Sequence, residues 1–197
     1  QGARQVGSTF KPFVYATAIE QLGMSPCDTI VDGPFMIRKG RHHVTEDWEP
    51  RNSNNQYRGM VTLKQGLAHS INTISAKLID KTGPEAVIEL THKLGVKSDI
   101  PAQPSIALGA VDITVEDMVA AYGTFANQGV YVKPQFITRI EDKSGVVIYE
   151  PIPESHDVLN KDIAFAVIKL LQGVTETGSG VRVRTEGGGS GDNRWTG

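Results

Sequence analysis

Ser8 and Lys11 are the first residues in the chain whose types and spacing could support a reaction. They lie three positions apart in the run Gly-Ser-Thr-Phe-Lys-Pro, which places two side chains on one side of a helical turn. A serine hydroxyl becomes a useful nucleophile when a neighbouring base takes its proton, and a lysine with a lowered pKa can be that base. The same residues fit a second interpretation, in which Ser8 caps a helix and Lys11 is a solvated residue of its first turn.

Ser70 and Asn72 form a second pair, in the segment "AHSINTISAKL". Taken alone, Ser-x-Asn also fits an ordinary polar pair near one end of a helix face. Its setting raises its interest, because it follows a long polar stretch and lies in a second apolar helical region. The order of the two pairs, Ser-x-x-Lys and then Ser-x-Asn, is typical of enzymes that form an acyl-serine intermediate.

The elements that must position these pairs are mostly helical. Apolar periodicity predicts helices, a polar stretch predicts a long loop bearing Trp48, and alternation predicts a hairpin. The helices are expected at 13–22, 62–79, 84–94, 114–127 and 162–172, the loop at 28–55, and the hairpin strands at 136–140 and 146–149. Arg182 and Arg184 are expected to alternate along a further strand. Helices followed by a small amount of strand predict an α+β fold.

Composition excludes several classes of function. The chain has 197 residues, a formal net charge of −2 and no basic tract, so nucleic acid is not an expected partner. Cys27 is the only cysteine, which excludes an internal disulfide and a cysteine-based metal site. His42 and His43 adjoin acidic residues in the long loop, but their spacing matches no usual ligand pattern, so we expect no metal and no cofactor. We expect no signal peptide among the residues given, and they include no apolar stretch of membrane-spanning length.

Three longer phrases carry a family resemblance. They are "RQVGSTFKPFVYATAIEQLG" (residues 4–23), "WEPRN" (48–52) followed by "GMVTLKQGLAHSINTISAKL" (59–78), and "PSIALGAVDITVEDMVAAYGTFANQGVYVKP" (104–134). Together they resemble the transpeptidase domain of class A (bifunctional) penicillin-binding proteins, over about residues 1–184. Val6 stands where that family usually has proline. The resemblance implies the serine β-lactamase/transpeptidase-like fold, a helical lobe beside an antiparallel sheet packed between helices.

The resemblance also implies a role for each residue of the two pairs. Ser8 would be the acylated nucleophile and Lys11 its base, although the identity of the base in this enzyme class is disputed. Ser70 would relay a proton to the leaving group or from the incoming amine. Asn72 would hydrogen-bond the substrate amide and orient Lys11.

A third motif of the family, a strand with Lys-Thr-Gly, has no counterpart where it is expected. The segment 187–191 has the Gly/Ser composition of a linker, and 192–197 ("DNRWTG") resembles the phrase that follows the missing strand. We therefore divide the chain into a partial transpeptidase domain (1–186), a linker-like segment and a remnant of a C-terminal strand. A literal Lys-Thr-Gly at 81–83 is interpreted as a helix end, because Pro84 follows it.

The implied function is a peptidoglycan D,D-transpeptidase that acts on D-Ala-D-Ala stem peptides and is acylated by β-lactam antibiotics. Its parent protein would be membrane-anchored, with this domain on the extracytoplasmic (periplasmic) face, and its oligomeric state is left open. Two alternatives remain: a non-catalytic or activity-impaired penicillin-binding fragment, and a serine β-lactamase. Against the β-lactamase, the sequence has no Glu-x-x-Leu-Asn loop to hold a hydrolytic water.

Overall fold

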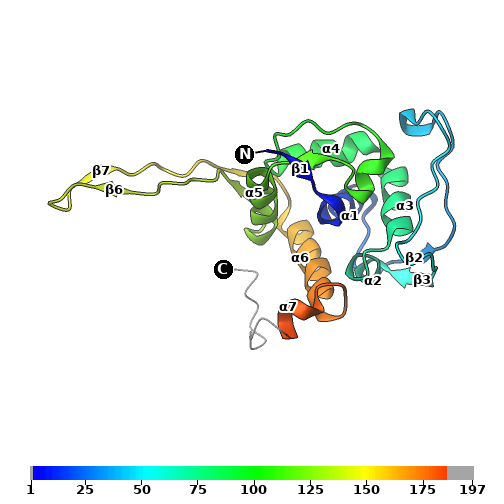
Figure 1. Cartoon of the computed structure of the whole chain (residues 1–197). Helices are drawn as coiled ribbons and strands as arrows, with labels where there is room; N and C mark the ends of the chain where they lie inside the picture. The colour runs from blue at the N-terminus through cyan, green and yellow to red at the C-terminus, as the bar shows by residue number, and fades with distance from the viewer. Residues whose placement is uncertain (1, 186–197) are drawn as a thin grey trace.

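The computed structural model describes residues 2–185 and has a helical body with a two-stranded arm (Figure 1). The α-helices are α1 (Lys11–Leu22), α2 (Leu63–Ala68), α3 (Asn72–Thr82), α4 (Pro84–Lys93), α5 (Val115–Ala126), α6 (Lys161–Glu176) and α7 (Val181–Thr185). Short 3-10 helices are η1 (Gly7–Phe10), η2 (Arg41–His43) and η3 (Pro104–Leu108). The strands are β1 (Arg4–Gln5), β2 (Thr29–Asp32), β3 (Gly59–Thr62), β4 (Asp112–Ile113), β5 (Val130–Val132), β6 (Ile140–Glu141), β7 (Val147–Tyr149) and β8 (Ser155–Asp157). The predicted α+β class is confirmed.

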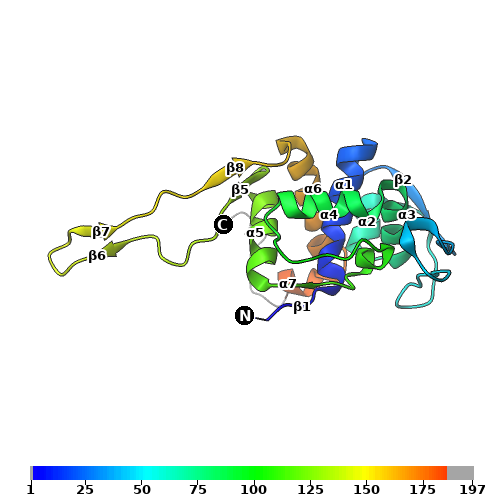
Figure 2. The same cartoon turned by 90° about the horizontal axis from the view of Figure 1, so that it is seen from above.

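Helix α1 is the centre of the body, and Figure 2 shows it running through the middle of the other helices. Every residue from 11 to 19 is buried, and α1 packs against α3, α4 and α6. Pro12 lies in the first turn, where its missing N–H removes no helical hydrogen bond, and Gly23 ends the helix in the left-handed region at φ 63°. A helix buried all round is held in place by packing, so residues at its start are positioned accurately.

The helix predicted over 62–79 is in fact two helices. Helix α2 ends at Ala68, and α3 begins at Asn72 after a turn in which Ser70 has a left-handed φ of 52°. Both helices bury their apolar residues, so the spacing of those residues continues across the break and conceals it. Similarly, the expected loop 28–55 contains β2, which pairs with β3 in an antiparallel register from Thr29↔Thr62 to Asp32↔Gly59.

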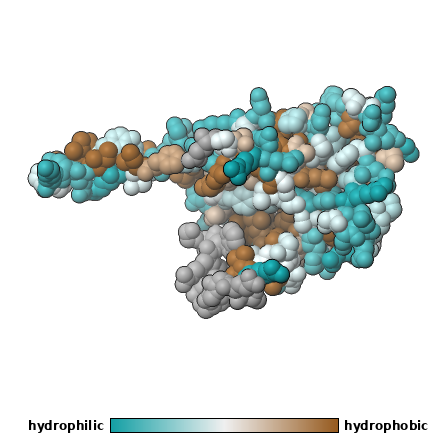
Figure 3. Space-filling model, viewed as in Figure 1, coloured by the Kyte–Doolittle hydropathy of each residue, from teal (hydrophilic) through white to brown (hydrophobic). Residues whose placement is uncertain are grey.

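The predicted hairpin is confirmed, although its strands are shorter than expected. Strands β6 and β7 pair antiparallel, and β5 pairs antiparallel with β8 nearer the body. Residues 133–154, between β5 and β8, form an arm that projects from the body (Figures 1 and 2). The paired strands of residues 2–185 make four separate two-stranded sheets. Figure 3 shows apolar side chains along the surface of the arm, where Phe136 and Ile152 are 83% and 91% exposed.

The prediction of a strand bearing Arg182 and Arg184 is wrong, because residues 181–185 form α7. The alternating run is short enough to fit either structure. The chain turns back after α6, with the Ser179 N–H donating to the Ala68 carbonyl (3.0 Å) and the Gly180 N–H to the Val174 carbonyl (3.0 Å). This turn directs 181–185 against α6, where no strand is available for pairing among the described residues. None of the helices in residues 2–185 is long and apolar enough to cross a membrane.

Candidate active site

Ser8 lies in η1, a tight turn that precedes α1. Gly7 has a left-handed φ of 55°, and its N–H donates to the Gly109 carbonyl (3.2 Å) in the turn after η3. A side chain at Gly109 would place its Cβ only 1.8 Å from the Gly7 carbonyl oxygen, so this contact requires glycine. On the other side, the Tyr122 hydroxyl of α5 donates to the Thr9 carbonyl (2.7 Å). The turn is held from two directions and presents Ser8 at the surface.

The interpretation of Ser8 and Lys11 as a helix cap and a solvated lysine is wrong. Neither η1 nor α1 has a side-chain cap hydrogen bond, and Lys11 is 0% exposed. Lys11 forms no ion pair with a carboxylate of residues 2–185; its Nζ contacts only neutral oxygens. Burial lowers the pKa of Lys11 to about 8, because the charged form is less well solvated there than in water.

Ser70 and Asn72 meet Lys11 at the break between α2 and α3. The Lys11 Nζ donates to the Ser70 carbonyl (2.8 Å), the Ser70 Oγ (2.8 Å) and the Asn72 Oδ1 (2.7 Å). The Ser70 Oγ is 2.9 Å from the Ser8 Oγ, so the Ser70 hydroxyl lies between the serine and the lysine. The structure therefore brings all four predicted site residues into one hydrogen-bonded cluster.

A buried polar network supports this cluster, and sequence reasoning did not identify it. The Asp32 carboxylate of β2 is 1% exposed and accepts from the Asn52 Nδ2 (2.8 Å), the Thr73 Oγ1 (2.5 Å) and the Arg58 N–H (2.9 Å). The Asn52 Oδ1 in turn accepts from the Thr73 N–H (3.2 Å) at the start of α3. Three donors on one carboxylate join β2 and the long loop to the helix turn that carries Asn72. Asn52 could have pointed to this network, because it is the last residue of "WEPRN", one of the phrases that carry the family resemblance.

The loop also contacts Asn72 directly. The Asn72 Nδ2 donates to the Arg51 carbonyl (2.8 Å), while its Oδ1 accepts from Lys11. Both ends of the Asn72 amide are therefore held, which fixes the orientation of the side chain.

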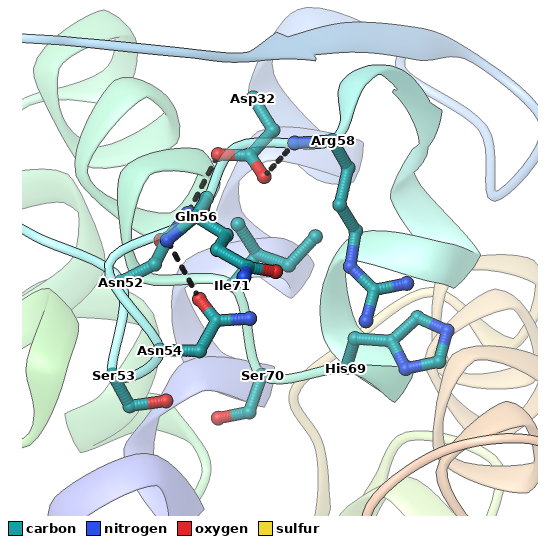
Figure 4. A pocket seen from close by; sticks show the side chains of 9 residues that line it. All are labelled: Asp32, Asn52, Ser53, Asn54, Gln56, Arg58, His69, Ser70 and Ile71. Atoms are coloured by element: carbon teal, nitrogen blue, oxygen red, sulfur yellow. Dashed lines mark hydrogen bonds between the residues drawn. The ribbon is translucent and has the colours of Figure 1, made fainter.

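A small polar cavity of about 30 Å³ lies beside Ser70 (Figure 4). Two of the residues that line it, Arg58 and His69, have basic side chains, and the sequence analysis did not identify either one. The pKa of His69 is lowered by burial and by the positive charge of Arg58, so its imidazole is neutral near pH 7. The remaining lining residues are Asp32, Asn52, Ser53, Asn54, Gln56, Ser70 and Ile71.

Other sequence candidates lie outside this cluster. Lys81 is exposed at the far end of α3 from Asn72, roughly 14 Å along the helix axis at 1.5 Å per residue, and Gly83 closes the helix. His42 contacts Asp80 and His43 contacts Glu85. Over residues 2–185 no three His, Cys, Asp or Glu side chains gather closely enough to hold a metal ion. The linker-like segment 187–191 and the remnant 192–197 lie outside the described residues.

Comparisons with known proteins agree on one family. The family model "Penicillin binding protein transpeptidase domain" matches residues 1–189. Penicillin-binding protein 1A of Aquifex aeolicus is 40% identical over 182 residues, which are 91% of this chain and 24% of that protein. The chain therefore spans about a quarter of the length of this relative, and a similar share of the Neisseria flavescens one (34% identical, 23% covered).

Solved structures show the same likeness. The crystal structure of penicillin-binding protein 1A from Haemophilus influenzae superposes with a TM-score of 0.85 at 26% identity, covering 93% of this chain and 32% of that one. PonA1 of Mycobacterium tuberculosis in complex with penicillin V has a TM-score of 0.71 at 25% identity, covering 85% of this chain and 46% of that one.

Proposed function

This chain belongs to the penicillin-binding protein transpeptidase family, and we propose that Ser8 is its acylated nucleophile in D,D-transpeptidation of peptidoglycan stem peptides. The observation that carries the proposal is the line of hydrogen bonds from the Ser8 Oγ through the Ser70 Oγ to the buried Lys11 Nζ. It supplies a nucleophile, a proton carrier and a base with a lowered pKa in direct contact.

The protonation state of Lys11 sets the direction of proton transfer along this line. As an ammonium, Lys11 uses its three N–H groups on the Ser70 carbonyl, the Ser70 Oγ and the Asn72 Oδ1. As a neutral amine it keeps two donors and gains a lone pair. The lone pair can then accept the Ser70 proton, while the Ser70 Oγ accepts the proton of Ser8. Lys11 thus acts through Ser70, and Ser8 is activated only when Lys11 is neutral.

The acyl transfer follows from these contacts. The Ser8 Oγ bonds to the carbonyl carbon of the penultimate D-Ala, the bond from that carbon to the D-Ala nitrogen breaks, and the proton from Ser8 passes through Ser70 to the leaving amine. A second amine then attacks the ester carbon, gives a proton back to Ser8 by the same route, and releases the serine. The position of Ser8 at the start of α1 adds a favourable field for negative charge developing on the oxyanion.

The missing Lys-Thr-Gly strand is expected to slow this chain relative to its parent. By the family resemblance that strand supplies one of the two oxyanion-hole N–H groups, and segment 187–191 stands where the strand is expected. The loss of one oxyanion donor typically costs about 100- to 1,000-fold in rate. Slow acylation would correspond to the activity-impaired alternative, with the site geometry retained.

The relatives support the wider setting of the reaction. PonA1 has been solved with penicillin V, which is consistent with β-lactams as acylating partners here. Because the chain spans about a quarter of its penicillin-binding protein 1A relatives, stem-peptide cross-linking, membrane anchoring of the parent and an extracytoplasmic location are part of the proposal.

The test is the intact-protein mass after incubation with benzylpenicillin, with Ser8→Ala as the matched control. We expect one stable penicilloyl adduct on the chain and none on the variant, with peptide mapping placing the adduct on Ser8. No adduct on a folded chain, or an adduct on another residue, would overturn the assignment. Rapid loss of the adduct with repeated hydrolysis of the antibiotic would favour a β-lactamase instead.

A further inference from the structure

The cavity beside Ser70 is lined by one positively charged side chain, Arg58, that the proposed reaction does not use. Arg58 precedes β3 and its side chain is exposed, extending toward His69 at one side of the cavity (Figure 4). The backbone N–H of Arg58 donates to Asp32, but its guanidinium forms no ion pair within residues 2–185. Its five N–H groups are thus available to a ligand that enters the cavity.

The one carboxylate in the cavity wall does not neutralise Arg58. Asp32 is buried, and its oxygens are occupied by Asn52, Thr73 and the Arg58 backbone. Burial lowers the pKa of Lys77 in α3, and the nearby charge of Asp32 opposes this shift only in part. With its oxygens occupied in this way, Asp32 forms no ion pair with the Arg58 guanidinium.

The neutral groups of the cavity suit the same kind of ligand. His69 presents a ring nitrogen, Gln56 and Asn54 present amides, and Ser53 presents a hydroxyl. A space of about 30 Å³ holds one or two waters, or a group of the size of a carboxylate, but no complete side chain. The planar guanidinium of an arginine matches the geometry of a carboxylate and can bind it through two parallel hydrogen bonds. The neutral donors of the cavity could add further hydrogen bonds.

We propose that Arg58 and His69, in the cavity beside Ser70, form a subsite for a peptide carboxylate. The carboxylate would belong to the peptide whose amine either leaves the acyl group at Ser8 or attacks it. This inference rests on the proposed function, because Ser70 is the group that passes a proton to or from that amine. The peptide amine must therefore come close to Ser70, and a carboxylate on the same molecule would reach the neighbouring cavity. The subsite would favour substrates with a free acid over their amidated counterparts.

The test is a binding titration that does not require turnover. N-acetyl-D-alanine and its neutral counterpart N-acetyl-D-alaninamide are added to the chain while the NMR signals of the His69 ring and the Ser70 amide are followed. We expect the acid to shift these signals and the amide to shift them about 10-fold less at equal concentration, since a charge-assisted pair contributes about 1.5–3 kcal/mol.

Variants make the assignment specific. Arg58→Gln keeps the backbone bond to Asp32 and should weaken binding of the acid about 10-fold or more, while Arg58→Lys should retain part of it. The matched control is Arg139→Gln, an arginine of the arm, which should bind as the unchanged chain does. Equal shifts with the acid and the amide, no shift with either, or full binding by Arg58→Gln would overturn the subsite.

A second part of the experiment identifies the source of the carboxylate. If the acid still binds after Ser8 has been acylated by benzylpenicillin, the carboxylate belongs to the acceptor; if acylation blocks it, it belongs to the leaving end of the donor. A chain that binds the acid through Arg58 but is never acylated would retain the subsite and contradict the proposed function. The two ideas can therefore fail separately.

Discussion

The cluster beneath Ser8 and the arm of β6 and β7 are opposite in how their residues are held. Lys11 is completely buried and its amine has three neutral partners, whereas every residue from 137 to 150 is exposed. The cluster places a charged group where solvation is poor, and the arm places apolar groups such as Ile148 in water. Burying an amine and exposing apolar side chains both cost free energy. Neither arrangement is needed to pack the body.

The two regions differ in how strongly a substitution should affect the protein. A buried polar group without its partners costs free energy, so each hydrogen bond in the cluster is coupled to the fold. An exposed apolar residue on a two-stranded ribbon contacts few neighbours, and its replacement changes little. We therefore expect substitutions in the cluster to have large effects on reactivity or stability, and substitutions in the arm to have small ones.

The largest effect is expected from Lys11→Met, which keeps the buried volume and removes the proposed base. Acylation of Ser8 by benzylpenicillin should fall by about 100- to 10,000-fold, the usual contribution of a general base. The measurement is the rate of adduct formation by intact-protein mass.

The control for Lys11→Met is Lys81→Met, at the far end of α3. Lys81 is exposed and has no contact with the cluster, so acylation should be unchanged. Equal loss in the two variants would mean that Lys81 has a role which its position does not explain.

A second large effect is expected from Asp32→Ala, which leaves three donors in the buried network without an acceptor. Buried donors left unsatisfied cost about 1–3 kcal/mol each, so the free energy of unfolding should fall by about 3 kcal/mol or more. Urea denaturation followed by circular dichroism measures the change. Asp47→Ala is a suitable comparison, because its carboxylate is 44% exposed beside Arg38, and a loss as large there would contradict the expectation.

A smaller, graded effect is expected from pH. Burial lowers the pKa of Lys11 to about 8, so the neutral amine becomes the major form above that pH. The acylation rate should rise with pH, about tenfold per unit below pH 8 because the neutral fraction rises by that factor, and level off above it. The dependence should be absent in Lys11→Met, and a rate that falls across this range would refute the role of the free amine.

The same shift affects stability, with a definite sign. Between pH 8 and the ordinary lysine pKa of 10.5, the unfolded chain binds the Lys11 proton and the folded chain does not. The contribution of Lys11 to the free energy of unfolding therefore increases with pH across that window and is constant below it. Comparing the pH dependence of the chain with that of Lys11→Met isolates this contribution.

The smallest effect is expected in the arm. Ile148→Val should change the free energy of unfolding by less than about 0.5 kcal/mol, because the side chain is 67% exposed. The same replacement at the fully buried Ile79 of α3 should cost about 0.5–1.5 kcal/mol. Thermal unfolding of the pair checks the contrast. An arm variant as costly as the core variant would show that the arm packs against something in solution.

The sequence by itself determined what can be read from local pattern. Pro12 and Gly23 mark the ends of α1, and Thr114 caps α5 by accepting from the Asp117 N–H (3.1 Å), so these helices were predictable. The types and order of Ser8, Lys11, Ser70 and Asn72 likewise identified the candidate site, because catalytic groups of this family keep fixed spacings within each motif.

Only the tertiary structure decided what depends on distant contacts. The left-handed Ser70, the pairing of β2 with β3, and α7 in place of a strand all arise from partners far away in the chain, which local periodicity does not register. The burial of Lys11 is of the same kind. A lysine in a first helical turn is ordinarily solvated. Lys11 is suited to the proposed role of base only because α1 lies at the centre of the body, with Ser70 and Asn72 contacting its amine.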